Sequence, residues 1–454
     1  MKKATLLSIT AMASLVTLVG CGEKGTESGT ASPAASTAAS AVPTAAAAKV
    51  DPFTMTVRHI HIRDTTKPSL KLLEEVVKKT ETDVPGLKFT LDGVEDTVNR
   101  NVKLKAEMAN GTQPAIFNLF GGADTVNYSK AGRLLALNDI MAEAGIKDSF
   151  FDLREFTVDG KIYGLPESGY IEGFFYNKKL FEQAGVQVPK TWNDLMSAME
   201  QLKAKGITPI AMGSGGGDGW VANMLVNSLM VGLGGPALQE GFTTGATKWT
   251  DPAVIETFKR IDDLAKKKYI DPNVLGKAFA EGQATFYTGK AAMLFDGSWA
   301  VNAIVGDTSV VKDSTGFFRM PDVGGAGDGF INGGWSNGYG FSAALKPNEL
   351  TAVKAFVKNF YTLENQKRTL VETNQIPAMK GVKDVQGASD LIKTIGEQQG
   401  SAKGAYPAFD AFVQPSVKVA LETTVQELLG GKIQPEAAAQ RMQKTQESAN
   451  ASGK

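Results

Sequence analysis

Short apolar segments of strand length alternate with amphipathic segments of helix length along this chain of 454 residues. Residues 54–62 are rich in β-branched side chains, and the segment after them places four apolar side chains on one helical face: Leu72, Leu73, Val76 and Val77. Residues 87–91 and 114–118 are predicted to form two further strands, with part of a helix at 102–108 between them. Strand, loop and helix in this order form the basic unit of an α/β lobe, so the sequence predicts an α/β fold.

A second series of such units follows, and its helix boundaries are clear. Asn177 is suited to cap one helix, which Gly185 should end, and Thr191 with Asp194 three positions later is typical of a capping box for the next. Residues 207–212 then return as a strand. The repeated order predicts a second α/β lobe.

The stretch from Phe286 to Trp299 combines a helix end, a buried strand and an exposed aromatic side chain. Gly289 is suited to end a helix, and the apolar run 291–295 has the length of a fully buried strand. In open α/β sheets the strand ends line the ligand crevice, so Asp296 and Trp299 are candidate ligand contacts. The alternative is a core strand followed by a turn, with Trp299 packed in the core.

The glycine-rich segment Gly213–Trp220 follows the strand at 207–212. It lacks the Gly-Lys-Ser/Thr ending of a phosphate-binding loop, so nucleotide binding is not expected. The segment is interpreted as a flexible cleft loop that presents Asp218 and Trp220. The alternative is a solvent loop in which Trp220 covers the core.

The N-terminus has the pattern of a processed secretion signal. Lys2 and Lys3 precede an apolar stretch at 4–19, and Cys21, the only cysteine, follows a Leu-x-Gly sequence. This resembles a bacterial lipobox, which implies a signal peptide at 1–20 and lipidation of Cys21. Residues 21–50 are poor in large apolar side chains and predict a flexible tether. An unlipidated cysteine in an ordinary signal peptide is the alternative.

The charges of the chain are balanced, with 48 basic and 48 acidic residues and no basic run of the kind that follows phosphates. Nucleic acid is therefore not an expected partner. His59 and His61 share one face of the first strand, but no third ligand of suitable spacing stands nearby, so no metal site is expected.

Several motifs closely resemble those of extracellular solute-binding proteins of family 1, the sugar-binding subunits of ABC importers related to maltose-binding protein. They span most of the chain in the family's order: the Gly-Lys-Ala-Ala-Met and Gly-x-Trp elements of 289–299, and the segments 161–166, 175–181, 189–192 and 374–378. One departure is Ala115, where the family usually has Asp after the proline.

The resemblance implies a two-lobed, periplasmic-binding-protein-like α/β fold of type II whose hinge has three inter-lobe crossings, expected near Gly164, Trp299 and Tyr339. Lobe 1 is expected to comprise residues 51–160 and 301–340, and lobe 2 residues 161–300 and 341–454. Rotation about such crossings would let the lobes close on a ligand.

The resemblance also implies the function. The chain is expected to be a monomeric, extracytoplasmic lipoprotein, anchored to the cell membrane, that captures a mono- or oligosaccharide and delivers it to the transmembrane subunits of an ABC permease. No enzymatic activity and no cofactor are expected. A binding protein for a non-sugar solute is an alternative, because the sequence does not identify the ligand.

Ten residues are candidate ligand contacts. Six are implied by the resemblance: Asp64, Asn118, Phe120, Tyr170, Trp299 and Tyr406. Four are added from the chemistry of their loops, which present carboxylates and aromatic faces suited to sugars: Asp218, Trp220, Asp296 and Trp335.

A secreted hydrolase is the competing class. Residues 334–338 match the G-x-S-x-G nucleophile elbow around Ser336, but a Ser hydrolase of that type needs a histidine later in the chain and none follows. A glycoside hydrolase with two carboxylates stays open on composition, since Asp and Glu are plentiful.

Overall fold

The computed structural model describes residues 51–383 and 385–452. The expected signal peptide, Cys21 and the tether therefore lie outside the described residues. Within the described part of the chain no single helix is long and apolar enough to cross a membrane, although one bent pair of helices, Trp220–Gly234 with Ala237–Thr244, passes the same length and composition test.

The first lobe is built on a five-stranded mixed sheet of order β2-β1-β3-β12-β6, in which β12 runs antiparallel to β3 and β6. Its strands are β1 (Phe53–His59), β2 (Leu87–Gly93), β3 (Ile116–Phe120), β6 (Gly164–Pro166) and β12 (Asn337–Phe341), beside a small ladder of β4 (Thr157–Val158) and β5 (Lys161–Ile162). Its helices are η1 (Asp64–Thr66), α1 (Lys67–Asp83), α2 (Asp96–Val98), η2 (Asn99–Lys103), α3 (Leu104–Asn110), α4 (Ala123–Lys130), α5 (Asn138–Glu143), η3 (Arg154–Phe156), α13 (Pro347–Phe360) and α14 (Leu363–Val371).

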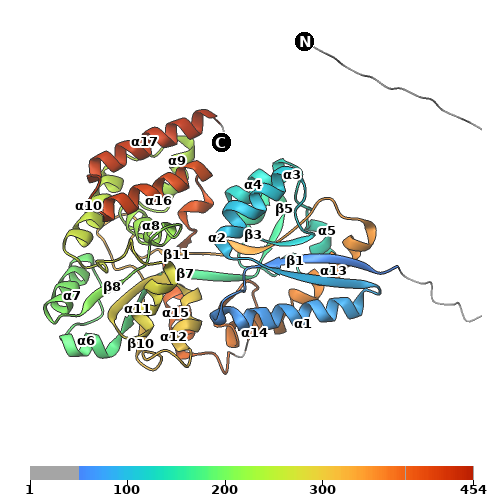
Figure 1. The fold of residues 1–454 in the computed structure, drawn as a ribbon, viewed down its shortest axis with the longest axis horizontal. Helices are drawn as coiled ribbons and strands as arrows, with labels where there is room; N and C mark the ends of the chain where they lie inside the picture. Colours follow the sequence, from blue (N-terminus) through green and yellow to red (C-terminus); the bar gives the residue numbers. More distant parts are fainter. Residues whose placement is uncertain (1–50, 384, 453–454) are drawn as a thin grey trace, which may run out of the picture. The chain divides into compact units, whose positions relative to one another are not determined.

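Helices cover both faces of this sheet (Figure 1). On one face Leu73 and Val77 of α1 share a core cluster with Phe356 of α13. On the other face Met108 of α3 packs with Phe117 of the central strand β3. Burying both faces explains why the central strand β3 is buried along most of its length.

The second lobe is built on a seven-stranded sheet of order β14-β11-β7-β9-β8, with β10 and β13 also paired to β7. Its strands are β7 (Ser168–Asn177), β8 (Thr208–Ala211), β9 (Ala291–Gly297), β10 (Thr315–Phe318), β11 (Ile331–Gly334), β13 (Ile376–Pro377) and β14 (Ala405–Tyr406). Its helices are α6 (Lys178–Ala184), α7 (Trp192–Ala204), α8 (Trp220–Gly234), α9 (Ala237–Thr244), α10 (Pro252–Lys266), α11 (Phe279–Tyr287), η4 (Ser298–Ala300), α12 (Val301–Val305), α15 (Asp390–Gly400), η5 (Phe409–Ala411), α16 (Pro415–Leu429) and α17 (Pro435–Ser452).

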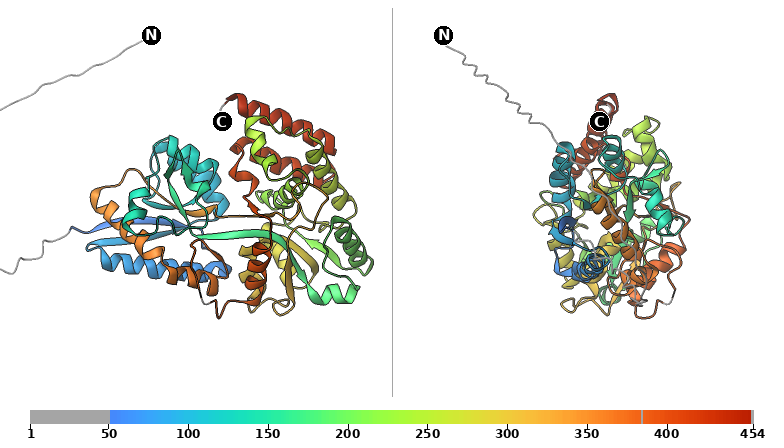
Figure 2. Two further views of the ribbon diagram at one scale, coloured as in Figure 1. Left: turned by 180° about the vertical axis from the view of Figure 1, so that it is seen from behind. Right: turned by 90° about the vertical axis from the view of Figure 1, so that its right-hand side faces the viewer.

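The two lobes lie side by side within one compact unit, with the red α16 and α17 at the second lobe and the orange α13 at the first (Figures 1 and 2). The two-lobed fold with three crossings agrees with the sequence prediction. The chain crosses between β6 and β7 at Glu167, crosses back between β11 and β12 at Trp335 and Ser336, and crosses a third time beyond α14, around β13.

The position of one expected crossing is corrected. Trp299 lies in η4, directly after β9, and both elements belong to the second lobe. The third crossing is formed by the segment around β13, whose Ile376 pairs with Gly169 of β7 while Met379 packs in the first-lobe core. The sequence contains a strand end at Trp299 but does not show which sheet the following chain joins.

The expected lobe boundaries are corrected for the same reason. Residues 301–334 contribute α12, β10 and β11 to the second lobe, although they were assigned to the first. Residues 341–361 pack on the first-lobe sheet through α13, although they were assigned to the second. The lobe that each segment joins is set by strand pairing between residues more than a hundred positions apart, which no local sequence pattern indicates.

The local signals agree with the structure. The Asn177 side chain accepts from the backbone N–H of Lys179 at 3.1 Å, and Gly185 ends α6 with φ of 72°. Thr191 and Asp194 form the expected capping box of α7. Strand β9 is buried throughout, as its apolar run predicted. These features depend on residues a few positions apart, which is why the sequence predicts them.

Candidate functional site

A cavity of about 270 Å³ lies where the two lobes meet, and both lobes contribute to its wall. The first lobe and the crossings contribute His61, Arg63, Glu95, Asp96, Arg100, Phe120, Glu167, Ser168, Ser336 and Asn337. The second lobe contributes Tyr170, Glu172, Trp220, Asn223, Met224, Asn227, Phe279, Gln283, Trp299, Asn332, Phe409, Asp410, Lys418 and Glu422.

Four aromatic side chains form one continuous wall of the cavity. The ring centroids of Tyr170 and Trp299 are 5.6 Å apart, those of Trp299 and Trp220 6.4 Å, and those of Trp220 and Phe279 4.8 Å. Trp220 and Phe279 are the first residues of α8 and α11, and Trp299 follows β9, so each ring projects from the end of an element. The wall offers flat apolar faces of the kind that cover sugar rings.

A buried carboxyl group lies beside this aromatic wall. Glu172 is on β7 and is 3% exposed, and the Asn332 side-chain amide donates to its Oε2 at 2.6 Å. Burial raises the pKa of Glu172 well above its usual range, and the charges of Asp410 and Asp296 add to the shift. Burial therefore favours the neutral form of this group, which can donate a hydrogen bond as well as accept one.

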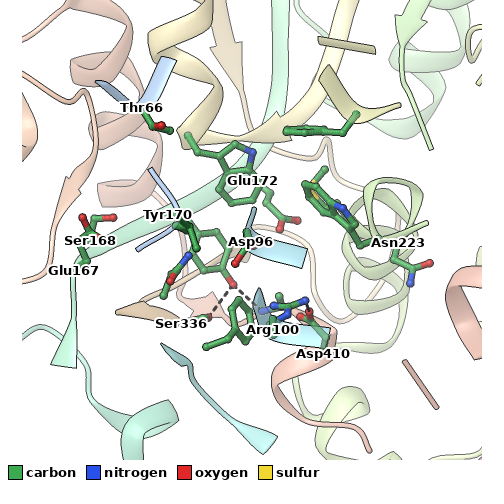
Figure 3. A pocket seen from close by; sticks show the side chains of 18 of the residues that line it. Thr66, Asp96, Arg100, Glu167, Ser168, Tyr170, Glu172, Asn223, Ser336 and Asp410 are labelled. Atoms are coloured by element: carbon green, nitrogen blue, oxygen red, sulfur yellow. Dashed lines mark hydrogen bonds and ion pairs between the residues drawn. The ribbon is translucent and has the colours of Figure 1, made fainter. Parts of the chain in front are cut away.

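The opposite side of the cavity carries an ion pair that joins the lobes. Arg100 of η2 donates to Asp410 of η5 at 2.8 Å, and the Arg100 guanidinium lies 3.9 Å from the centre of the Phe120 ring. Lys418 lies 3.5 Å from the same carboxylate. Burial alone would raise the pKa of Asp410, but these two cations outweigh burial and lower it. Figure 3 shows the Arg100–Asp410 contact and the Tyr170–Ser336 contact within the pocket.

Hydrogen bonds at the hinge connect the same cavity to both lobes. The Tyr170 hydroxyl accepts from the Ala408 backbone N–H at 2.9 Å and lies 3.5 Å from the Ser336 hydroxyl. His61 and Glu167 are 2.8 Å apart beside the first crossing. Burial raises the pKa of Glu155, a first-lobe carboxyl near Ser336, to about 7.

Four of the ten predicted contacts line the cavity together: Phe120, Tyr170, Trp220 and Trp299. Their role in binding a ligand stays a prediction, but the structure brings them into one wall. The six other predicted residues do not line the cavity, and each has another partner.

Asp64 and Asn118 lie away from the cavity wall. Asp64 is exposed and forms an ion pair with Lys67 at 2.8 Å, because η1 turns it outward after β1. Asn118 is 2% exposed within β3, and its amide donates to the side-chain Oδ1 of Asn337 on the neighbouring strand at 2.6 Å. Asn118 itself does not line the cavity, and it is connected to the cavity wall only by this hydrogen bond to Asn337.

Asp218 and Asp296 lie behind the aromatic wall and support it. Asp218 accepts from the Phe279 backbone N–H at 2.8 Å and from the Trp220 indole at 3.4 Å. Asp296 is fully buried, accepts from the Gln283 amide and from the Gly297 N–H, each at 2.8 Å, and has a pKa raised by burial to about 7. Both carboxyls fix the residues that carry the rings instead of facing a ligand.

Trp335 and Tyr406 are structural in this geometry. Trp335 stacks on Phe151 with ring centroids 5.5 Å apart, and its indole donates to the Pro377 carbonyl at 3.2 Å. Tyr406 is buried on β14, where Ser228 hydrogen-bonds its hydroxyl. The crossing turns Trp335 away from the cavity toward the first-lobe core.

The glycine-rich loop is also not the flexible loop that was expected. A Cβ on Gly213 would lie 2.1 Å from the Ala278 carbonyl oxygen, so the glycines allow the loop to pack closely on the segment before α11. Trp220 begins α8 instead of ending a loop. The glycines of this segment therefore indicate close backbone packing, and this packing also fixes the position of Trp220.

The sequence analysis missed the polar residues of the second-lobe wall: Glu172, Asn223, Asn227 and Asn332. One signal was available, because Asn223 and Asn227 stand four positions apart in a helix that is otherwise almost entirely apolar. Polar residues on one face of a buried helix require partners, and the cavity supplies the place where a ligand could provide them.

The surroundings of His59, His61 and Ser336 bear on the metal site and the serine hydrolase that were considered from the sequence. Among the residues that the structure describes, no group of three or more His, Cys, Asp or Glu side chains could hold a metal ion. The two histidine rings stack on each other with centroids 5.9 Å apart. Ser336 is buried between strands β11 and β12, which is not the strand-turn-helix setting of a nucleophile elbow.

Comparison with known proteins adds the family context. The model of the bacterial extracellular solute-binding protein family matches residues 64–367. A multiple sugar-binding protein of Streptococcus mutans is 26% identical over 318 residues, covering 69% of this chain and 73% of its own length. A diacetylchitobiose binding protein of Streptomyces coelicolor is 26% identical over 227 residues, covering 48% of this chain and 50% of its own.

Solved structures share the two-lobed fold. A chitin oligosaccharide binding protein superposes with a TM-score of 0.87 at 64% identity, over 88% of this chain and 100% of that one. Maltose-bound MalE3 of T. maritima superposes with a TM-score of 0.74 at 18% identity, over 87% of this chain and 99% of that one, which shows the fold alone.

Proposed function

We propose that this chain, which belongs to the bacterial extracellular solute-binding protein family, captures an oligosaccharide outside the cytoplasm and delivers it to the permease of an ABC importer. The observation that carries the proposal is the inter-lobe cavity, where an aromatic wall stands next to buried amide and carboxyl groups. Sugars combine apolar C–H faces with polar rims, and a site with both kinds of group suits them.

The proposed ligand is a chitin-type oligosaccharide. The supporting observation is the 64% identity, over 88% of this chain, with a structure named for chitin oligosaccharide binding. The diacetylchitobiose binding protein of Streptomyces coelicolor points to the same ligand class. Other members of the family are named for other sugars, so the family alone does not select this ligand.

The proposed mechanism is non-covalent capture. The ligand contacts the aromatic wall of the second lobe, and rotation about the three crossings brings the first-lobe wall with Arg100 and Phe120 against its other side. Closing removes water from the aromatic faces and strengthens the polar contacts. The closed form is then the one that the permease would recognise.

Isothermal titration calorimetry with N-acetylchito-, cello- and malto-oligosaccharides tests this function. We expect saturable binding of the first without any change in oligosaccharide length after incubation. A bound ligand should also raise Tm by mass action. Shortening of the oligosaccharide would instead support a hydrolase, and binding of non-sugar solutes only would contradict the carbohydrate assignment.

Anchoring through Cys21 is a further part of the proposal, supported by the lipobox-like sequence before it. The Cys21→Ser variant should lose membrane attachment and keep its ligand affinity, because the sequence predicts the cysteine at the start of a tether that precedes the lobes. Fractionation after a salt wash, with calorimetry on the released protein, measures both. Retention of the variant in the membrane fraction would contradict lipid anchoring.

A further inference from the structure

Three asparagine side chains on the second-lobe wall keep polar atoms without a hydrogen-bond partner among the described residues. Asn227 has neither its Oδ1 nor its Nδ2 paired, and the Oδ1 atoms of Asn223 and Asn332 are also unpaired. Their exposed fractions are 3%, 9% and 2%, respectively. All three line the cavity.

The three asparagines belong to one region of the wall. Asn223 and Asn227 are four positions apart on α8 and so lie on the same helical face. Asn332 pairs across β11 and β14 with Tyr406, whose hydroxyl is bonded by Ser228, the residue after Asn227. The fold thus holds an acceptor-rich set of amides at the junction of α8 and β11.

Leaving the polar atoms of these three asparagines unpaired lowers the stability of the folded protein. A buried donor or acceptor without a partner costs about 1–3 kcal/mol, and apolar residues would avoid this cost on a helix as apolar as α8. A functional explanation requires a ligand that restores the missing hydrogen bonds. That ligand must donate to several oxygens and accept from one amide N–H, the Nδ2 of Asn227.

We propose that Asn223, Asn227 and Asn332 form a subsite for the acetamido group of an N-acetylated sugar. The inference rests on the proposed function and goes further by identifying the residues that distinguish an N-acetylated sugar from its unmodified counterpart. The C=O and N–H of a secondary amide point in opposite directions, so the C=O suits the free Nδ2 of Asn227 and the N–H suits one of the free Oδ1 atoms, while neighbouring sugar hydroxyls can donate to the others. Met224, next to Asn223 on the cavity wall, offers an apolar contact for the acetyl methyl group.

The surrounding charges favour a neutral group. Glu172 accepts from the Asn332 amide at 2.6 Å, and burial raises the pKa of Glu172 well above its usual range. Burial therefore disfavours the charged carboxylate that would attract the ammonium of a de-N-acetylated sugar. Two of the cavity's cations, Arg100 and Lys418, are held by Asp410, so the wall also offers little to an anionic sugar.

Competition between matched oligosaccharides of equal length tests the subsite. The probes are N-acetylchitotriose, its de-N-acetylated form and cellotriose, measured by calorimetry at pH 7.5 on the full chain. We expect the wild type to bind N-acetylchitotriose at least about tenfold more tightly than either analogue, because a polar site left unpaired by an analogue rejects it. Asn227→Leu should abolish most of that preference by weakening the binding of N-acetylchitotriose more than that of cellotriose.

A matched control separates recognition from stability. Gln239 on α9 is fully buried, its Oε1 and Nε2 are both without a partner among the described residues, and it does not line the cavity. Gln239→Met and Asn227→Leu should therefore both keep or raise Tm, while only Asn227→Leu changes the preference. A second variant, Asn227→Asp, keeps two acceptors but loses the donor, and should shift preference toward the ammonium-bearing sugar.

The outcomes separate this inference from the proposed function. If the wild type binds none of the oligosaccharides, the proposed function fails and the inference fails with it. If it binds N-acetylchitotriose and the Asn227 variants keep the wild-type preference, the proposed function stands and the acetamido subsite is overturned. Equal wild-type affinity for N-acetylchitotriose and cellotriose also overturns the subsite.

Discussion

The two lobes differ in the kinds of buried polar group that they contain. In the first lobe, the buried guanidinium of Arg58 is paired with both Asp92 and Glu107. In the second lobe, the buried carboxyls of Glu172 and Asp296 have amide partners, and Asn227 has no partner among the described residues. Both lobes keep buried polar atoms without a partner among the described residues, but on the cavity wall these are mainly asparagine amides in the second lobe and the charged groups of Asp96 and Arg100 in the first.

The difference has a consequence for ligand recognition. Aromatic and amide groups that determine affinity and selectivity come mainly from the second lobe, through β7, α8 and β9. The first lobe contributes charged groups, of which Arg100 reaches across to Asp410. We therefore expect the second lobe to select the ligand and the first lobe to hold the closed state.

The largest expected effect that tests this comparison is on the pH dependence of stability. The folded-state pKa of Asp296, about 7, is raised by burial above its usual value of 3.8. Its contribution to stability is therefore fully present below about pH 4 and is lost as pH rises through about 7. Asp296→Asn should remove this decline, up to about 4 kcal/mol in the free energy of unfolding, since one pKa unit is worth about 1.4 kcal/mol.

Urea unfolding at several pH values between 4 and 8 measures this effect. Asp92 of the first lobe is the matched control, because the Arg58 and Lys103 cations outweigh burial and lower its pKa. Its contribution is present above its unfolded pKa and is lost as pH falls, so Asp92→Asn should change the acid limb instead. If Asp296→Asn keeps the wild-type slope between pH 4 and 8, the raised pKa of Asp296 does not contribute to the pH dependence of stability.

The next effect concerns the aromatic wall. Trp299→Ala should weaken oligosaccharide binding by about 2 kcal/mol or more, which is over tenfold in Kd, because it removes the ring between Tyr170 and Trp220. Calorimetry and circular dichroism on the same sample measure affinity and folding.

Trp335→Ala is the control, since this indole packs on Phe151 outside the cavity. It should lower Tm with little change in Kd. The opposite pattern, with normal affinity in the folded Trp299→Ala protein and a large fall in Tm, would make Trp299 a core residue.

The smallest effect is on closure. Arg100→Met and Asp410→Asn should each weaken binding, and the double variant should lose less than the sum, with a coupling of about 1 kcal/mol, because both remove the same inter-lobe pair. Small-angle scattering should show a smaller radius of gyration on ligand binding, less completely in the variants. Additive effects, or an unchanged radius at saturation in the wild type, would show that the pair does not hold the lobes closed.

The sequence by itself determined the features that depend on near neighbours. Asn177, Gly185 and the Thr191–Asp194 box were predicted because a cap is made by groups within three or four positions of each other. The buried strand β9 was predicted because its apolar run has no polar face. The resemblance to the family also predicted Phe120, Tyr170 and Trp299 as ligand contacts, and the structure places all three on the cavity wall.

Only the tertiary structure decided which segments share a lobe and which side chains share a cavity. Residues 301–334 join the second sheet and 341–361 the first because β11, β12 and α13 find partners more than a hundred positions away. Asp64 turns outward, and Asn223, Asn227 and Asn332 turn inward, for reasons that depend on the register of β1, α8 and β11 against distant elements. Local sequence records a side chain's chemistry, whereas its partners are set by the packing of the whole chain.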